Sequence, residues 1–221
     1  MNEQFWWFLA RSSGIVAWAL LVASVALGLV LSTRALGKRP TPAWSLDLHR
    51  GVSGMAVLLT AVHLAALVLD SYVEFGVAEI LVPMASSWQP LAVTWGVVAL
   101  YLLVVIEVTS LLRTRIPTRV WRRLHLTSFV LYLLTTVHFV TAGTDADGMP
   151  SIVAVIGSMV LVAALMLVRI LAPRGSAPRP ARTSPPPRTP RTPRMPRTPG
   201  APAAETTEVT ETTEVTEDVS R

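Results

Sequence analysis

The chain has 221 residues, of which 52% are hydrophobic and 15% are charged, with a formal net charge of +5 and no cysteine. This length would allow one or two soluble domains, but the charged residues leave uncharged runs of 22, 19 and 21 residues, which exclude a soluble fold. The lack of cysteine excludes disulfides, iron–sulfur clusters, thiolate-ligated heme and zinc fingers.

Five apolar segments follow one another along the chain. A helix needs about 20 mostly apolar residues to cross the hydrocarbon layer of a membrane, which is about 30 Å thick. Segments of this kind lie at residues 12–33, 46–69, 91–112, 121–142 and 150–170. The first segment does not resemble a cleaved signal, because no basic region precedes its apolar run, the run is too long and no small-residue cleavage site follows it. We therefore predict an all-α membrane bundle of five transmembrane helices.

The charged residues alternate between the two ends of these segments. Basic residues gather around the connections after the first and third segments, at Arg34, Lys38, Arg39, Arg50, Arg113, Arg115, Arg119, Arg122 and Arg123. The charged residues in the connections after the second and fourth segments are all acidic, namely Asp70, Glu74, Glu79, Asp145 and Asp147. Because positively charged loops stay in the cytoplasm, we predict a multi-pass protein of the cytoplasmic membrane with its N-terminus outside and its C-terminus inside.

The composition changes after the fifth segment. Eleven of the seventeen prolines lie in residues 173–221, where large apolar residues are rare. This segment is rich in Pro, Arg and Thr at first and in Glu and Thr later, and such a composition cannot form a core. We predict a membrane domain at residues 1–172 and a disordered cytoplasmic tail at residues 173–221.

All four histidines of the chain fall in the second and fourth segments, at His49, His63, His125 and His138. Ionisable residues inside membrane spans are costly and indicate function. The two segments run in the same direction, because one antiparallel helix separates them. The spacings of 14 and 13 residues correspond to about 21 and about 20 Å along a helix. His49 is therefore expected at the depth of His125, and His63 at that of His138.

Two imidazoles that face each other at one depth can supply both axial ligands of a heme iron. Fourteen residues nearly complete four turns, but thirteen leave His138 about 140° away from His125 around an ideal helix. A distortion of the fourth segment is required, and Thr135 and Thr136 could bend it by bonding back to the backbone. The alternatives are ordinary interhelical hydrogen bonds and a metal-ion pathway, although a pathway usually adds carboxylates and only Glu107 is available.

The histidine pattern resembles the ferric reductase-like transmembrane domain family, the membrane part of ferric reductases and NADPH oxidases. In this chain the histidine pattern is His49-x13-His63 and His125-x12-His138. The runs HRGVSGMAVLLTAVHLAAL, LVPMASSWQPLAV and WRRLHLTSFVLYLLTTVHF are also similar to actinobacterial members. The resemblance covers about residues 10–170. The family often has six helices with the ligands on the third and fifth, whereas here they fall on the second and fourth.

The resemblance implies two b-type hemes, an inner one held by His49 and His125 and an outer one held by His63 and His138. These would pass electrons from a cytoplasmic-side donor to an extracytoplasmic acceptor or redox partner, as the membrane component of an oxidoreductase. No Gly-rich dinucleotide loop follows the fifth segment, so the donor is expected to be a separate cytoplasmic flavoprotein or a quinol.

Two alternatives stay open. One is a quinol-fed subunit of an extracytoplasmic reductase, such as a methionine sulfoxide reductase. The other, from a different class, is a heme-free membrane scaffold or metal-ion transporter. Apart from redox partners we expect only membrane lipid to bind, and no nucleic acid.

Further residues are candidates for contact with heme. Arg50, Arg122 and Arg123 lie at the inner depth and could pair with propionates, although ordinary positive-inside charge explains them too. Arg11 lies at the outer end of the first segment, against that rule. Gly51 and Gly54 could let a porphyrin approach the second helix closely, or could serve helix packing.

Overall fold

The computed structural model describes residues 3–33, 42–70 and 75–171. These residues belong to one compact unit, Met1–Arg174. The predicted tail at residues 173–221 lies outside the described residues, as do the basic residues of the first connection.

The described residues form helices and no strand. The helices are α1 (Glu3–Thr33), α2 (Pro42–Leu69), α3 (Val77–Leu81), α4 (Pro90–Leu111), α5 (Thr118–Leu126), α6 (Ser128–Ala142) and α7 (Met149–Leu171). Five stretches are long and apolar enough to cross a membrane, namely Gln4–Thr33, Ala43–Leu69, Pro90–Leu111, Thr118–Ala142 and Met149–Leu171. The predicted all-α bundle of five membrane spans is confirmed, and the chain is a multi-pass membrane protein.

Some helix bounds differ from those predicted. The first helix begins at Glu3, well before residue 12, and the fourth span consists of two helices, α5 and α6. The helix α4 begins at Pro90, directly after Gln89 with a φ of 39°. Proline suits the first turn of a helix because the backbone N–H that it lacks would have no partner there. The short α3 was not predicted.

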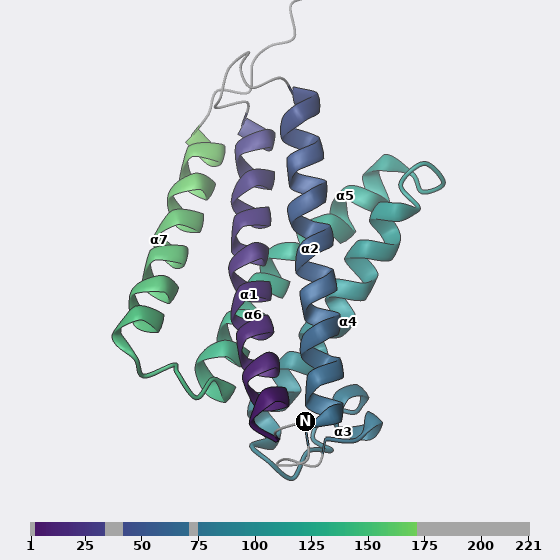
Figure 1. Ribbon diagram of the computed structural model, residues 1–221. Helices are drawn as coiled ribbons and strands as arrows, with labels where there is room; N and C mark the ends of the chain where they lie inside the picture. Colours follow the sequence, from purple (N-terminus) through teal and green to yellow (C-terminus); the bar gives the residue numbers. More distant parts are fainter. Residues whose placement is uncertain (1–2, 34–41, 71–74, 172–221) are drawn as a thin grey trace, which may run out of the picture. The chain divides into compact units, whose positions relative to one another are not determined.

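The helices pack in two antiparallel pairs that are consecutive in the chain. α1 packs against α2, and α4 packs against α5 and α6. Figure 1 shows α1 between α2 and α7, and α1 also contacts α6. The site described below is enclosed by α1, α2, α4 and α6.

Polar contacts join the helices where they meet. Trp18 of α1 donates from its indole nitrogen to the hydroxyl of Thr136 of α6 at 3.1 Å, and its ring stacks on Phe139 at 4.8 Å between centroids. The hydroxyls of Tyr132 and Ser158 lie 2.8 Å apart and connect α6 to α7. Helices in lipid associate through close packing and such hydrogen bonds, because the hydrophobic effect does not drive them together.

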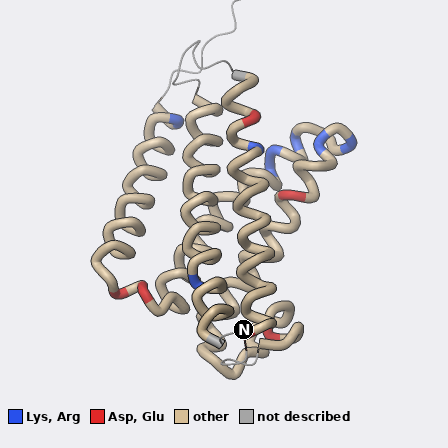
Figure 2. The backbone as a smooth tube through the Cα atoms, in the orientation of Figure 1, with Lys and Arg blue, Asp and Glu red and all other residues tan. Residues whose placement is uncertain are grey.

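Basic and acidic residues lie mostly towards opposite ends of the helices. Figure 2 shows most described basic residues towards one end of the bundle and most described acidic residues towards the other. Large apolar side chains such as Leu58, Val104 and Val153 are exposed along the helices, as expected of surfaces that contact lipid. Which end lies in the cytoplasm stays a prediction.

Candidate functional site

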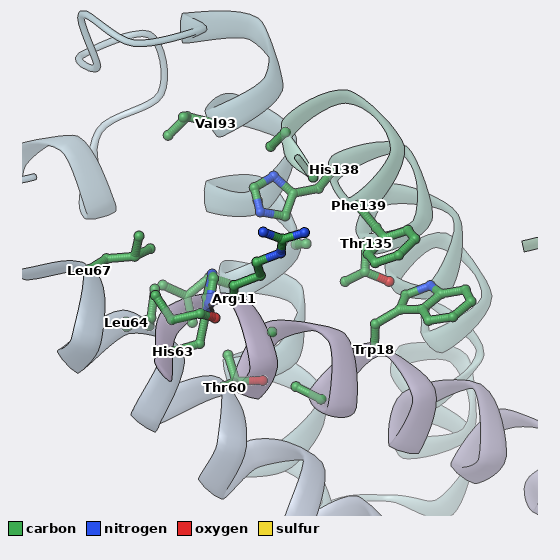
Figure 3. A pocket seen from close by; sticks show the side chains of 18 of the residues that line it. Arg11, Trp18, Thr60, His63, Leu64, Leu67, Val93, Thr135, His138 and Phe139 are labelled. Carbon is green, nitrogen blue, oxygen red and sulfur yellow. Dashed lines mark hydrogen bonds between the residues drawn. The ribbon is translucent and has the colours of Figure 1, made fainter. Parts of the chain in front are cut away.

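His63 of α2 and His138 of α6 line one cavity between the helices (Figure 3). Its other lining residues are mostly apolar or small, and they include Trp18, Phe139 and Thr135. The structure thus brings together the two histidines that were predicted to share the outer depth.

A backbone carbonyl holds each of these two imidazoles. Nδ1 of His63 lies 2.7 Å from the carbonyl oxygen of Ala10 in α1, and Nδ1 of His138 lies 2.8 Å from that of Ala92 in α4. A carbonyl can only accept, so Nδ1 carries the proton in both rings. Nε2 is then left with a free lone pair, which is the tautomer that binds metal ions.

A glycine lies beside each ring and makes room for it. A Cβ atom added at Gly14 would lie 2.9 Å from Nδ1 of His63, and one added at Gly96 would lie 2.8 Å from Cε1 of His138. Real Cβ atoms do not approach other atoms so closely. Each glycine follows by four residues the residue whose carbonyl accepts, so one turn of the helix provides both the acceptor and the space.

His49 of α2 and His125 of α5 form the second pair. Their ring centroids are 6.1 Å apart and their planes cross at 80°. Two imidazoles on opposite sides of one metal ion would have ring centres about 6.2 Å apart, from bonds of about 2.0 Å and about 1.1 Å between each nitrogen and its ring centre. The separation therefore suits two ligands of one iron.

His49 has the same kind of support as the outer histidines. Its Nδ1 lies 3.1 Å from the carbonyl oxygen of Ser24 in α1, and an added Cβ at Gly28 would lie 3.6 Å from its Cε1. The hydroxyl of Ser24 lies 2.7 Å from that of Ser53. The Nε2 atom of His49 is again the nitrogen left for a metal.

His125 differs from the other three histidines. Its Nδ1 is buried without a hydrogen-bond partner among the described residues, as are Nε1 of Trp121 and Oγ of Ser110. The Trp121 ring stacks on His125 with centroids 5.0 Å apart, and the guanidinium of Arg113 lies 4.7 Å from the centre of the Trp121 ring.

The distortion that was expected in the fourth span lies at a different place. Thr135 and Thr136 do bond back to carbonyls of their own helix, but α6 continues through both of them to Ala142. The interruption is at Thr127, between α5 and α6, where ψ is −8° and the backbone N–H bonds to Leu124 at 3.0 Å. The interruption of the fourth span, a tighter turn, therefore lies at Thr127, before the two threonines at which a bend was expected.

Of the four candidate arginines, Arg11 is the one that lines the cavity. It pairs with Asp145 and lies 4.7 Å from the centre of the Trp7 ring. Arg50 is exposed and pairs with Asp47 at 3.6 Å. The remaining two, Arg122 and Arg123, are exposed on α5.

The candidate glycines of α2 lie away from the cavity. Gly51 and Gly54 are exposed, and an added Cβ at either would meet nothing within 4 Å. Close approach instead involves Gly14 and Gly96 on the neighbouring helices, whereas an added Cβ at Gly28 would make an ordinary contact with His49 at 3.6 Å. Gly14 and Gly28 repeat the 14-residue spacing of His49 and His63, but this spacing alone does not show that they face the histidines.

Comparison with known protein families finds one match. The model of the ferric reductase like transmembrane component matches residues 13–136, which is more than half of the 221-residue chain. The match includes His49, His63 and His125 and ends two residues before His138. Comparisons with curated proteins and with solved structures find no match. The chain therefore belongs to the ferric reductase-like transmembrane family. Membership in this family indicates electron transfer across a membrane.

Proposed function

We propose that this protein transfers electrons across the cytoplasmic membrane through two b-type hemes, one between His49 and His125 and one between His63 and His138. The observation that carries the proposal is how the imidazoles of the outer pair, His63 and His138, are held. Both imidazoles donate from Nδ1 to a carbonyl of a neighbouring helix and line one cavity. Histidine ligands of metals are commonly oriented in this way by their other ring nitrogen.

When bound, each heme would supply one-electron transfer, with His49 and His125 holding one heme and His63 and His138 holding the other. The residues of the chain would then orient the imidazole ligands and give the hemes apolar surroundings. The carbonyls of Ala10 and Ala92 fix the tautomer of the outer rings, and the stacked pair Trp18 and Phe139 provides an apolar wall.

Arg11 is the candidate partner of an outer heme propionate, because it is the candidate arginine that lines the cavity. Its ion pair with Asp145 keeps the guanidinium at the cavity while balancing its charge. Arg50, Arg122 and Arg123 are proposed for the inner heme on their position alone, because the contacts of the described residues do not bring them to a histidine pair.

The donor is proposed to be a separate cytoplasmic flavoprotein or a quinol, and the acceptor an extracytoplasmic ion or redox protein. The connection after α4 and the helix α5, which carries His125, together contain five arginines. This positive region suits an anionic electron donor at the cytoplasmic face. The predicted tail at residues 173–221 would lie on the same side.

Purification of the full-length protein from heme-sufficient cells tests the proposal. We expect b-type Soret and alpha bands and about two hemes per chain in the pyridine hemochrome assay. Substituting either outer histidine by alanine should remove one heme and leave the other. A colourless preparation would overturn the proposal and would favour a heme-free scaffold or a metal-ion transporter.

The donor is identified in isolated membranes. Reduction of the hemes by a quinol alone would assign the quinol-fed alternative, as in a subunit of an extracytoplasmic reductase. Reduction that requires NAD(P)H and an added flavoprotein would assign the ferric reductase-like pathway.

A further inference from the structure

Three of the four histidines rest on the same local arrangement. A carbonyl of a small residue accepts from Nδ1, and a glycine four residues later lies beside the ring. The three sets are Ala10 and Gly14 with His63, Ser24 and Gly28 with His49, and Ala92 and Gly96 with His138. The fourth histidine, His125, has no such carbonyl.

The spacing of the first two sets shows where the fourth should be. On α1 they are 14 residues apart, and the same step on α4 leads from Ala92 to Ile106 and from Gly96 to Ser110. Fourteen residues are close to four helical turns, so Ser110 lies on the same face of α4 as Gly96. At this fourth position serine stands where the other three sets have glycine.

The hydroxyl of Ser110 behaves unlike its neighbours. Thr109, the preceding residue, bonds back to the carbonyl of Val105 at 2.7 Å, as helical hydroxyls usually do. Oγ of Ser110 is buried without a partner among the described residues, and so is Nδ1 of His125. Buried polar atoms nearly always have a partner in the working state of a protein.

The chemistry of the three unpartnered atoms decides which can pair. If Nε2 of His125 holds iron, its Nδ1 carries a proton and can only donate. Nε1 of Trp121 can also only donate, whereas the serine hydroxyl can accept. Of these three atoms, Oγ of Ser110 is therefore the one that can accept from Nδ1 of His125.

We propose that Ser110 is the positioning residue of the inner heme and accepts a hydrogen bond from Nδ1 of His125 when the heme is bound. This inference rests on the proposed function, because it requires His125 to be an iron ligand. A hydrogen bond from the outer nitrogen makes an imidazole ligand more basic and so favours ferric over ferrous iron. Ser110→Ala should remove this effect and raise the midpoint potential of one heme.

The experiment is a redox titration of full-length protein, followed in the alpha band and resolved into two components. Loss of one hydrogen bond should shift the reduction equilibrium of one component by about two- to tenfold toward ferrous iron, and tenfold corresponds to about 59 mV for one electron. The other component should not move. Ser110→Thr keeps the hydroxyl and should stay near the wild-type midpoint, and Thr109→Ala should shift neither.

Several outcomes are distinguishable. If Ser110→Ala loses one heme and Ser110→Thr retains both, the positioning role is supported. If Ser110→Ala binds two hemes with unchanged midpoints, or if Ser110→Thr shifts as far as Ser110→Ala, the hydroxyl is not the partner of His125 and the inference is overturned. In both of those cases the proposed function stands, whereas wild-type protein without heme would remove it.

Discussion

Each histidine ring in the outer cavity occupies space that only a glycine leaves free. An added Cβ would lie 2.8 Å from His138 at Gly96 and 2.9 Å from His63 at Gly14. These glycines weaken their helices, because glycine in a helix interior is less stable than alanine by about 0.5–1 kcal/mol. The close approach of the ring is a physical reason for keeping them.

Gly96→Ala tests this reason. The new methyl group must push the imidazole of His138 away from α4 and out of hydrogen-bond reach of Ala92. We expect the variant to lose most of one heme, measured by pyridine hemochrome, and to keep the other. Gly157→Ala is the matched control, since an added Cβ there meets nothing within 4 Å, and it should keep both hemes. Gly96→Ala protein with an unaltered spectrum would contradict the role of the glycine.

The ion pair of Arg11 and Asp145 makes an electrostatic prediction about the outer heme. Both residues line the cavity of His63 and His138, and a unit charge close to a bound heme changes the energy of an added electron by about 1 kcal/mol. Arg11→Gln should lower the midpoint of one heme, because a positive charge that favours the ferrous state is lost. Asp145→Asn should raise the same midpoint.

A redox titration of the two variants provides the test. Asp147→Asn changes the same charge in the same connection at a residue that does not line the cavity, so its shift should be smaller. Shifts of equal sign in the Arg11 and Asp145 variants would show that neither side chain acts on the heme through its charge.

At the scale of the helices, the second and fourth spans each carry two histidines, but their helices are built differently. In α2 a continuous helix carries His49 and His63 with a spacing of 14 residues. In the fourth span the spacing is 13, and the helix is interrupted at Thr127, between the two histidines. Thr127 does not line the cavity of His63 and His138, and we expect the break to set the direction of His125.

An alanine inserted between Thr127 and Ser128 tests the function of the break. One added residue would rotate α5 relative to α6 by about 100° and turn His125 away from His49. We expect loss of one heme with the other retained. An alanine inserted between Thr114 and Arg115, outside the spans, should leave both hemes in place. Two retained hemes after the insertion at Thr127 would mean that the break does not set the direction of His125.

The five spans could be predicted from the sequence, but the break at Thr127 and the glycines beside the histidines could not. Uncharged runs of about 20 residues follow directly from the energy of burying charge in lipid, so the five spans and the depth-matched histidine pairs could be predicted. The break at Thr127 could not, because Thr127 lies in an apolar run with no proline or glycine to mark a kink. The supporting role of Gly14 and Gly96 depends on which residues of neighbouring helices face the histidines, which periodicity within one helix does not contain.

The four histidines lie in two similar parts of the membrane unit, which are called halves here. In the first half α1 supports both histidines of α2 with carbonyl and glycine sets, and in the second half α4 supports His138 of α6 with one such set. The first half is α1 with α2, and the second is α4 with α5 and α6. Direct contact between the halves runs chiefly through α1 against α6, where Trp18 meets Thr136 and Phe139.

This architecture predicts that heme binding stabilises the association of the halves. Each proposed iron would join α2 of one half to α5 or α6 of the other, two helices that do not pack extensively against each other. A ligand that binds only the folded state stabilises it by about 4 kcal/mol at a thousandfold excess over its Kd. Protein expressed under heme limitation should therefore melt at a lower temperature in detergent than heme-loaded protein.

The melting experiment also separates heme binding from other effects of heme limitation. The double variant His63→Ala/His138→Ala, made in heme-sufficient cells, should melt between the loaded and the heme-limited protein, because it keeps the inner pair. Trp18→Phe removes the hydrogen bond to Thr136 while keeping an aromatic ring, so it should weaken the direct contact and increase the difference between loaded and heme-limited protein. Equal melting temperatures with and without heme would show that helix packing alone holds the two halves together.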